Sequence, residues 1–194
     1  VGFEVAFGDQ AQLPAIQIPG QQMDAQLRGF VDRVDAWKED GRNYYRVVDY
    51  KTGKKDFDYC DVFNGLGLQM LLYLFSLEQE GESLLGAHPI PAGVQYFPAR
   101  VPIIPVDGNL TNEEAQLERQ PQWKRKGLIL ADEDVLYAME NSDSPVRLSC
   151  RRKKDGTVTG DIASREQFKL LSKYVFRLLG TMVDEIASGN VTPN

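Results

Sequence analysis

Apolar and polar residues alternate most regularly in the first fifty positions, and such alternation predicts β-strands. Residues 2–7 place Phe3, Val5 and Phe7 two apart, so we expect one strand with these side chains on a single face. A second short strand is expected at 15–18. Residues 27–37 and 44–51 are rich in Val, Tyr and Phe, and segment 38–43 between them contains Asp40-Gly41. This pair is typical of a tight turn, so the two segments predict an antiparallel hairpin.

The pattern after the hairpin changes to helical spacing. A nearly continuous apolar run predicts a helix over 63–80 that ends before Gly81. Residues 94–97 predict the next strand, which makes this helix a crossover between parallel strands. Short apolar run 128–130 and a helix at 132–140 follow. The polar segment 147–160 predicts a hairpin that turns at Asp155-Gly156.

Two further helices have recognisable starting signals. Thr111 and Glu114 form a capping-box pattern after the proline-rich segment 101–108, and Pro121 is expected to end or kink that helix. Ser164 and Gln167 form a second capping box for a long helix that reaches residue 188.

The order of elements predicts an α/β fold with a mixed β-sheet flanked by helices. We expect a single domain over 1–194, with an elaboration at 99–160 and a C-terminal helix at 164–189.

Composition limits the classes of function. The 194 residues are 42% hydrophobic, which suits one globular domain, and no run approaches the roughly 18 apolar residues of a membrane span. We therefore expect no signal peptide and no membrane partner. The net charge of −6 argues against a module that grips nucleic acid with its whole surface, but it allows a local groove. Cys60 and Cys150 lie far apart without a second ligand at metal spacing, which favours free thiols in a reducing cytoplasm.

The predicted hairpin carries the candidate chemistry. Asp49 and Lys51 are two apart and share a face, and Asp32 shares a face of the partner strand with Phe30 and Val34. An acid among apolar neighbours is costly unless its charge is compensated. Two such acids suit Mg²⁺ or Mn²⁺, because Mg²⁺ is held by one or two carboxylates together with substrate phosphates.

Such a cation activates water and polarises a phosphoryl oxygen, and Lys51 would orient that water or offset developing charge. The alternative interpretation is a surface ion pair between Asp49 and Lys51, with Asp32 paired to Arg33 or Arg28. Gln69 and Tyr73 share a face of the apolar helix. A buried Gln69 would need amide partners, from a cation site, from nucleic-acid backbone or from nearby main chain.

Three motifs together resemble a known family. GFVDRVD, VVDYKTG and LQMLLYL follow one another in the order found in the RecB-type branch of the PD-(D/E)xK nucleases, and the chain is most similar to the nuclease domains of AddB-type helicase–nuclease subunits. The blocks AGVQYFPA (92–99) and KRKGLIL (124–130), with the closing Gly189-x-x-x-Pro193 pattern, extend the similarity over 27–194. The resemblance implies a restriction-endonuclease-like mixed sheet flanked by helices.

The resemblance also assigns roles. It implies that Asp32 and Asp49 bind the metal with the Tyr50 main-chain carbonyl, that Lys51 is the catalytic lysine, and that the DNA path is lined by Gln69 and Tyr73. The implied activity is Mg²⁺-dependent exonuclease cleavage of single-stranded DNA delivered by the helicase, beside an AddA-like helicase–nuclease subunit, during double-strand-break repair in the cytoplasm.

The sequence departs from the family in two places. These nucleases often carry a further ligand, frequently His, upstream of the sheet, but the only histidine here is His88, before Pro89 in an expected loop. AddB-type domains also bind an iron–sulfur cluster through four cysteines, and Cys60 and Cys150 match none of those positions. We therefore expect a trimmed fragment without iron–sulfur ligands, although the cluster is expected in the full-length subunit.

Other interpretations remain open from sequence alone. A catalytically silent module that binds DNA or docks a partner subunit is the main alternative, and a metal phosphoesterase acting on small molecules is another.

The segment Thr52-Gly53-Lys54 lacks the first glycine and the final Ser or Thr of a phosphate-binding loop, so no nucleotide site is expected there. The basic runs 124–126 and 151–154 either contact DNA phosphates or are solvated loop charges. Trp37 and Trp123 either stack on bases or pack.

Overall fold

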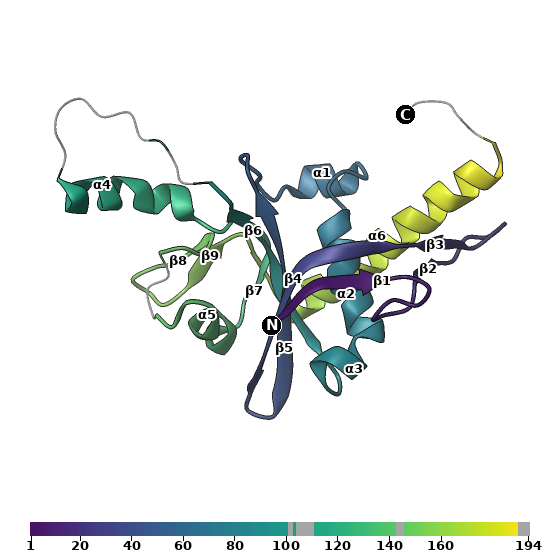
Figure 1. Ribbon diagram of the computed structural model, residues 1–194, viewed down its shortest axis with the longest axis horizontal. Helices are drawn as coiled ribbons and strands as arrows, with labels where there is room; N and C mark the ends of the chain where they lie inside the picture. Colours follow the sequence, from purple (N-terminus) through teal and green to yellow (C-terminus); the bar gives the residue numbers. More distant parts are fainter. Residues whose placement is uncertain (101–102, 104–110, 143–145, 190–194) are drawn as a thin grey trace.

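The structure, a computed structural model, describes residues 1–100, 103, 111–142 and 146–189. Its centre is a six-stranded sheet with the order β1-β4-β5-β6-β7-β10 (Figure 1). The pairs β1–β4, β4–β5 and β6–β7 are antiparallel, whereas β5–β6 and β7–β10 are parallel. The predicted mixed sheet with flanking helices is therefore confirmed. The strands are β1 (Gly2–Phe7), β4 (Gly29–Glu39), β5 (Arg42–Lys51), β6 (Ile90–Pro98), β7 (Ile129–Leu130) and β10 (Ile162–Ala163).

The hairpin β4–β5 forms as the sequence predicts, with strand bounds shifted by two residues or fewer. Its two-residue turn is Asp40-Gly41, and both residues have positive φ, 46° and 74°. Positive φ at both positions defines the turn whose twist matches that of paired strands, and Asp-Gly is a preferred sequence for it. The register runs from Arg33 opposite Val48 to Glu39 opposite Arg42. Local turn chemistry thus fixes which residues face each other across the hairpin.

The edge strand β1 differs from its predicted face pattern. Val5 and Phe7 are buried at 1% and 3% exposure, but Phe3 is 62% exposed, so the three side chains do not share one face. Glu4 has a φ of 50°, outside the extended region, and this interrupts the alternation between Phe3 and Val5.

The predicted helix over 63–80 is wrong in its first part. The chain forms α1 (Tyr59–Phe63) and then α2 (Gln69–Glu80), followed by α3 (Glu82–Leu85). Gly65 and Gly67 lie between α1 and α2 with φ of 77° and 65°, a conformation that ends a right-handed helix. Helix α2 is the predicted crossover between the parallel strands, and it packs on the sheet, where the Tyr45 hydroxyl donates to the Leu74 carbonyl at 2.6 Å.

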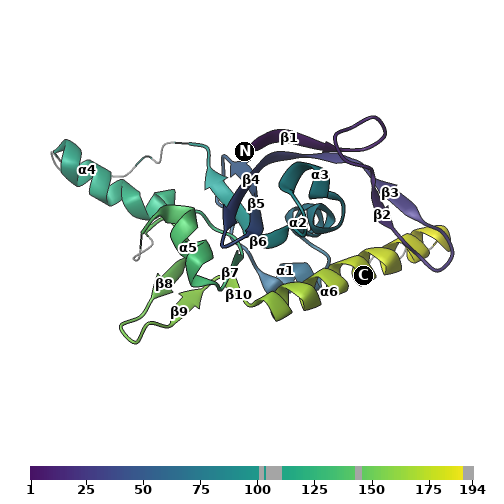
Figure 2. The ribbon, with the colours of Figure 1, turned by 90° about the horizontal axis from the view of Figure 1, so that it is seen from below.

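The longest helix is α6 (Arg165–Ala187), which packs against α2 on the same side of the sheet (Figure 2). Its predicted capping box is present: Ser164 accepts from the Gln167 N–H, and the Gln167 side chain accepts from the Ser164 N–H.

Near the C-terminal end of α6, the Asp184 carboxylate accepts from the N–H groups of Gln21 and Gln22. These contacts hold the small hairpin of β2 (Ile16–Ile18) and β3 (Ala25–Leu27). The sequence interpretation missed β3 and β10.

The elaboration at 99–160 lies on the side of the sheet away from α2 and α6 (Figures 1 and 2). It contains α4 (Asn112–Arg119), α5 (Glu133–Glu140) and a hairpin of β8 (Cys150–Arg152) and β9 (Val158–Gly160). The predicted capping box of Thr111 and Glu114 starts α4, and a 3-10 turn containing Pro121 follows it. Segment 101–108, except residue 103, lies outside the described residues, as does the closing pattern after Gly189. None of the helices in the described part of the chain is long and apolar enough to cross a membrane.

Candidate metal centre

The hairpin brings the predicted acids together at one end of the sheet. The register places Arg33 opposite Val48, so its continuation by one residue places Asp32 opposite Asp49. The Asp49 carboxyl lies within hydrogen-bonding reach of both the Asp32 carboxyl and the Lys51 amine. The distance from Lys51 Nζ to Asp49 Oδ2 is 2.5 Å. These groups lie at the carboxyl end of β5, beside the parallel strand β6, which is where open α/β sheets bind ligands.

The electrostatics of Asp49 favour a cation at this position. Burial raises the pKa of Asp49, the nearby Asp32 carboxyl raises it further, and the Lys51 amine opposes both effects. The Asp49 side chain is only 17% exposed. Two neighbouring carboxylates repel each other when both are ionised, and a bound cation removes that repulsion. The pair of Asp32 and Asp49 is therefore a candidate cation site, with Asp49 partly buried and Asp32 open to solvent.

Asp32 lies at the exposed edge of the pair, which corrects one sequence expectation. Of the two apolar residues expected on the same face as Asp32, Val34 is buried but Phe30 is 68% exposed, so Asp32 does not lie on a core-facing surface. Val31 and Val34 are both buried although they are three apart, which shows that the regular alternation of the strand is interrupted here. Asp32 Oδ2 accepts from the Tyr50 N–H at 3.2 Å. Since a strand residue directs its N–H and C=O to the same neighbour, the Tyr50 carbonyl also faces the Asp32 side.

The alternative surface pairing is present only for Asp49. Lys51 does pair with Asp49, but Arg33 pairs with Asp35 at 2.6 Å, and Arg28 pairs with Asp9. Within the residues that the structure describes, no ion pair involves Asp32. An ionisable group beside a second acid, without a cationic partner of its own, is available to a metal ion.

The donor set fits a hard divalent cation. Among the described residues, no group of three or more His, Cys, Asp or Glu side chains is placed to hold a metal. Two carboxylates and a main-chain oxygen are nevertheless enough for Mg²⁺ or Mn²⁺, which complete their coordination with waters and substrate phosphate. An iron–sulfur cluster does not fit the described residues, because Cys60 on α1 and Cys150 on β8 are single thiols on separate elements.

Helix α2 presents the two predicted helix residues near this end. Tyr45 contacts the middle of α2, and a crossover helix runs antiparallel to its strands, so its N-terminus lies toward Asp49 and Lys51. Gln69 is exposed, which corrects the expectation of a buried amide. Its Nε2 donates to the Tyr73 hydroxyl at 3.3 Å. Tyr73 is 7% exposed, and its ring stacks on Phe7 with centroids 5.8 Å apart. Only Gln69 is therefore freely accessible from solvent.

Gly29 makes room for Tyr73, a role that sequence reasoning missed. A Cβ added at Gly29 would lie 2.2 Å from the Tyr73 hydroxyl oxygen. Gly29→Ala is therefore expected to displace Tyr73 and to lower the free energy of unfolding by about 1–3 kcal/mol, the usual cost of overpacking. The measurement is urea unfolding of Gly29→Ala, Tyr73→Phe and the double variant. The Gly29→Ala penalty should be smaller in the Tyr73→Phe background, and an equal penalty in both would contradict this contact.

Tyr96 is a second neighbour that the sequence interpretation did not single out. It lies opposite Asp49 in the parallel pairing of β5 and β6. Burial raises the pKa of Tyr96 to about 12, and the charges of Asp49 and Asp61 contribute. Its hydroxyl therefore stays protonated near neutral pH and remains a hydrogen-bond donor at the edge of the site. The strand pattern at 94–97 was the only available signal, because nothing local in the sequence reports the parallel register.

Comparisons with known proteins show what the chain is similar to. Residues 1–194 match the family model described as the PD-(D/E)XK nuclease superfamily. Similar curated proteins are the B subunits of ATP-dependent helicase/deoxyribonucleases: that of Acetivibrio thermocellus is 40% identical over 201 residues, and that of Desulforamulus reducens is 35% identical over 196 residues. The corresponding protein of Clostridium tetani is 36% identical over 197 residues. These matches cover 98–100% of this chain but 17% of each relative, so the chain spans about a sixth of their length.

Proposed function

The chain belongs to the PD-(D/E)XK nuclease superfamily, and from this premise we propose that it is the deoxyribonuclease domain of an AddB-type helicase–nuclease subunit. The proposed reaction is Mg²⁺-dependent exonuclease hydrolysis of phosphodiester bonds in single-stranded DNA during double-strand-break repair in the cytoplasm. The observation that carries the proposal is that Asp49 pairs with Lys51 at 2.5 Å and lies opposite Asp32 in the continued hairpin register. We propose that residues 1–194 act as one domain.

In this mechanism Asp32, Asp49 and the Tyr50 carbonyl would hold the cation. When bound, Mg²⁺ or Mn²⁺ supplies activation of water and polarisation of the scissile phosphate. The Lys51 ammonium, adjacent to Asp49, orients the attacking water and offsets the negative charge that develops on the phosphate. Gln69 contacts the strand near the bond that breaks, and the buried Tyr73 positions Gln69 through their hydrogen bond at the inner side of the DNA path. These roles need only groups that the hairpin and the start of α2 bring to one end of the sheet.

The wider setting of the proposal comes from the relatives. They are named as subunits of an ATP-dependent helicase/deoxyribonuclease, so we propose that the substrate strand comes from a helicase and that an AddA-like subunit is the partner. We further propose that the iron–sulfur cluster of such subunits is bound by cysteines outside this chain. A catalytically silent module is disfavoured, because a half-buried Asp49 beside a second acid lowers stability unless a bound cation compensates the charge.

Metal removal and substrate choice test this function together. The complete helicase–nuclease is treated with a chelator and assayed on a single-stranded oligonucleotide and on a small aryl phosphodiester. Oligonucleotide cleavage is expected to disappear and to return with Mg²⁺ or Mn²⁺, because without the cation the attacking water is not activated and the scissile phosphate is not polarised. Cleavage that persists in the chelator, or equal turnover of the small phosphodiester, would overturn the proposal.

A further inference from the structure

A groove that collects positive charge begins beside the candidate metal centre. Its volume is about 710 Å³, and it lies between the loop that follows β5 and the segment that leads into β7. Its lining includes six cationic side chains and a single acid, Asp56, although the whole chain carries a net charge of −6. The cations are Lys51, Lys54, Lys55, Arg100, Lys124 and Lys126. The positive charge is therefore gathered locally, next to Lys51.

Among the described residues, most of these cations make no ion pair with an acid. Lys51 pairs with Asp49, and Lys126 Nζ lies 2.9 Å from Asp56 Oδ1. The other four make no ion pair within the described parts of the chain. Asp56 is 66% exposed, and an exposed pair of this kind contributes about 1 kcal/mol or less. A polyanion entering the groove can therefore replace Asp56 as the partner of Lys126 at little cost.

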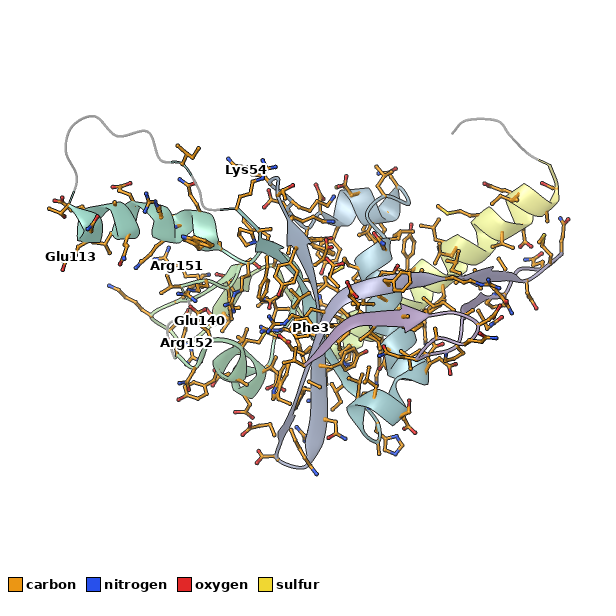
Figure 3. All side chains as sticks on the ribbon, in the orientation of Figure 1. Phe3, Lys54, Glu113, Glu140, Arg151 and Arg152 are labelled. Atoms are coloured by element: carbon orange, nitrogen blue, oxygen red, sulfur yellow. The ribbon has the colours of Figure 1, made fainter. Side chains whose placement is uncertain are left out.

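The sheet connects this groove directly to the cleavage residues. Asp49 on β5 lies opposite Tyr96 on β6, and the Tyr96 N–H donates to the Lys126 carbonyl at 2.7 Å. Neighbouring strands are spaced about 4.8 Å apart, so the Lys126 main chain lies roughly 10 Å from that of Asp49. The row Asp49, Tyr96 and Lys126 leads from the site into the groove. Lys54, in the loop that follows β5, also lines the groove and lies near the tip of that strand (Figure 3).

We propose that this groove binds the sugar–phosphate backbone of the DNA strand next to the bond that is cleaved, with Lys54, Lys124 and Lys126 contacting phosphates. The proposal rests on the proposed nuclease function and adds the substrate path. Lysine is suited to this role because its ammonium contacts phosphate as a point charge without reading sequence. The groove would hold the strand in register while Asp32, Asp49 and Lys51 act on it.

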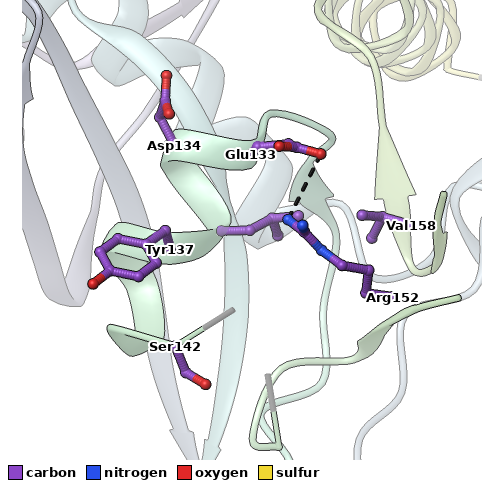
Figure 4. A pocket seen from close by; sticks show the side chains of 7 residues that line it. Glu133, Asp134, Tyr137, Ser142, Arg152 and Val158 are labelled. Carbon is purple, nitrogen blue, oxygen red and sulfur yellow. Dashed lines mark ion pairs between the residues drawn. The ribbon is translucent and has the colours of Figure 1, made fainter. Parts of the chain in front are cut away.

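The second basic run of the chain has a different setting. Arg151 and Arg152 belong to β8, well away from Lys54 (Figure 3). Arg152 Nη2 lies 3.6 Å from Glu133 Oε1 across a cavity of about 170 Å³ between α5 and the β8–β9 hairpin (Figure 4). Lys153 and Lys154 follow at the exposed hairpin turn and do not line the groove. They therefore provide a matched control with the same change of charge.

The first test compares two double variants in the complete helicase–nuclease. For Lys54→Gln with Lys124→Gln, the KM for a single-stranded oligonucleotide is expected to rise about tenfold at physiological salt, with the loss in KM rather than in kcat. The slope of log affinity against log salt should fall by about 1.4, because each phosphate contact on a single strand contributes about 0.7. Lys153→Gln with Lys154→Gln should leave KM and slope at wild-type values. Equal effects from the two pairs would overturn the proposal.

A second test does not depend on cleavage. An oligonucleotide carrying 4-thiothymidine is photo-crosslinked to the complete enzyme without divalent metal, and the labelled peptides are identified by mass spectrometry. Crosslinks are expected in 51–56 and 122–126, and crosslinks confined to other segments would refute the groove. With Asp49→Asn these crosslinks should persist while cleavage stops. If cleavage survives in Asp49→Asn, the proposed function fails, and the crosslink positions still decide whether the groove binds DNA.

Discussion

Replacing Asp49 with asparagine in the complete helicase–nuclease is expected to lower single-strand cleavage by this domain by about a thousandfold or more, which corresponds to about 4 kcal/mol of transition-state stabilisation. Asparagine keeps the size of the side chain but removes the negative charge that would hold the cation beside Asp32. The change also removes the ion-pair partner of Lys51. The measurement is the initial rate on a single-stranded oligonucleotide at saturating Mg²⁺.

Folding must be separated from chemistry in this experiment. Asp40→Asn makes the same chemical change in the turn of the same hairpin, where Asp40 has a φ of 46°. Asn-Gly is at least as favourable as Asp-Gly in such a turn, so this control should keep wild-type activity and stability. Both variants should show the wild-type free energy of unfolding within about 1 kcal/mol. Wild-type cleavage by Asp49→Asn would remove the acid pair from the mechanism.

Local signals in the sequence were sufficient for much of the fold. The Asp40-Gly41 turn sets the hairpin register, and the register in turn brings Asp32 and Asp49 together. The capping boxes at Thr111 and Ser164 locate two helix starts, because each depends on residues three apart. The PD-(D/E)xK resemblance was confirmed by the family match over the whole chain. Features that depend on neighbouring residues were therefore predictable, and one of them carries the candidate site.

Features that depend on distant contacts were not predictable. The apolar run predicted one helix over 63–80, but Gly65 and Gly67 interrupt it. Glycine inside a helix costs only about 1 kcal/mol, so tertiary packing decides whether the helix continues through such residues. Gln69 was expected to be buried because its neighbours are apolar, yet it lies on the exposed side of the first turn of α2. The basic groove combines segments some seventy residues apart, so only the folded chain shows it.

The other face of the hairpin holds a charged cluster that no sequence signal singled out. Asp35 lies opposite Arg46 in the antiparallel register, and its carboxylate accepts from Arg46 Nη2 at 2.8 Å and from Arg33 Nε at 2.6 Å. Arg46 also donates to Gln95 Oε1 at 2.8 Å. Asp35, Arg46 and Gln95 are all buried, at 7%, 9% and 0% exposure. One carboxylate therefore compensates two arginines behind the strand pair that carries Asp32 and Asp49.

Asp35→Asn is expected to lower the free energy of unfolding by about 3–5 kcal/mol, because it leaves Arg46 buried without a counter-charge. Urea unfolding followed by tryptophan fluorescence measures this loss. The matched control is Asp24→Asn, at an exposed position that makes no ion pair within the described chain, and it should change stability by about 0.5 kcal/mol or less. A loss below about 1 kcal/mol for Asp35→Asn would show that the cluster contributes little to stability.

The pH dependence of the Asp35→Asn effect identifies its cause. Burial alone would raise the pKa of Asp35, but the hydrogen bonds from Arg33 and Arg46 outweigh it and hold the pKa below its usual value. A carboxylate with a lowered folded-state pKa contributes stability above its unfolded pKa of about 3.9 and loses that contribution as the pH falls through the folded value. The stability difference between wild type and Asp35→Asn should therefore be constant from neutral pH to about pH 4 and should shrink below it. A difference that stays constant under strongly acidic conditions would assign the loss to altered packing, and the charge pairing of Asp35 with the two arginines would then not be what holds the hairpin in place.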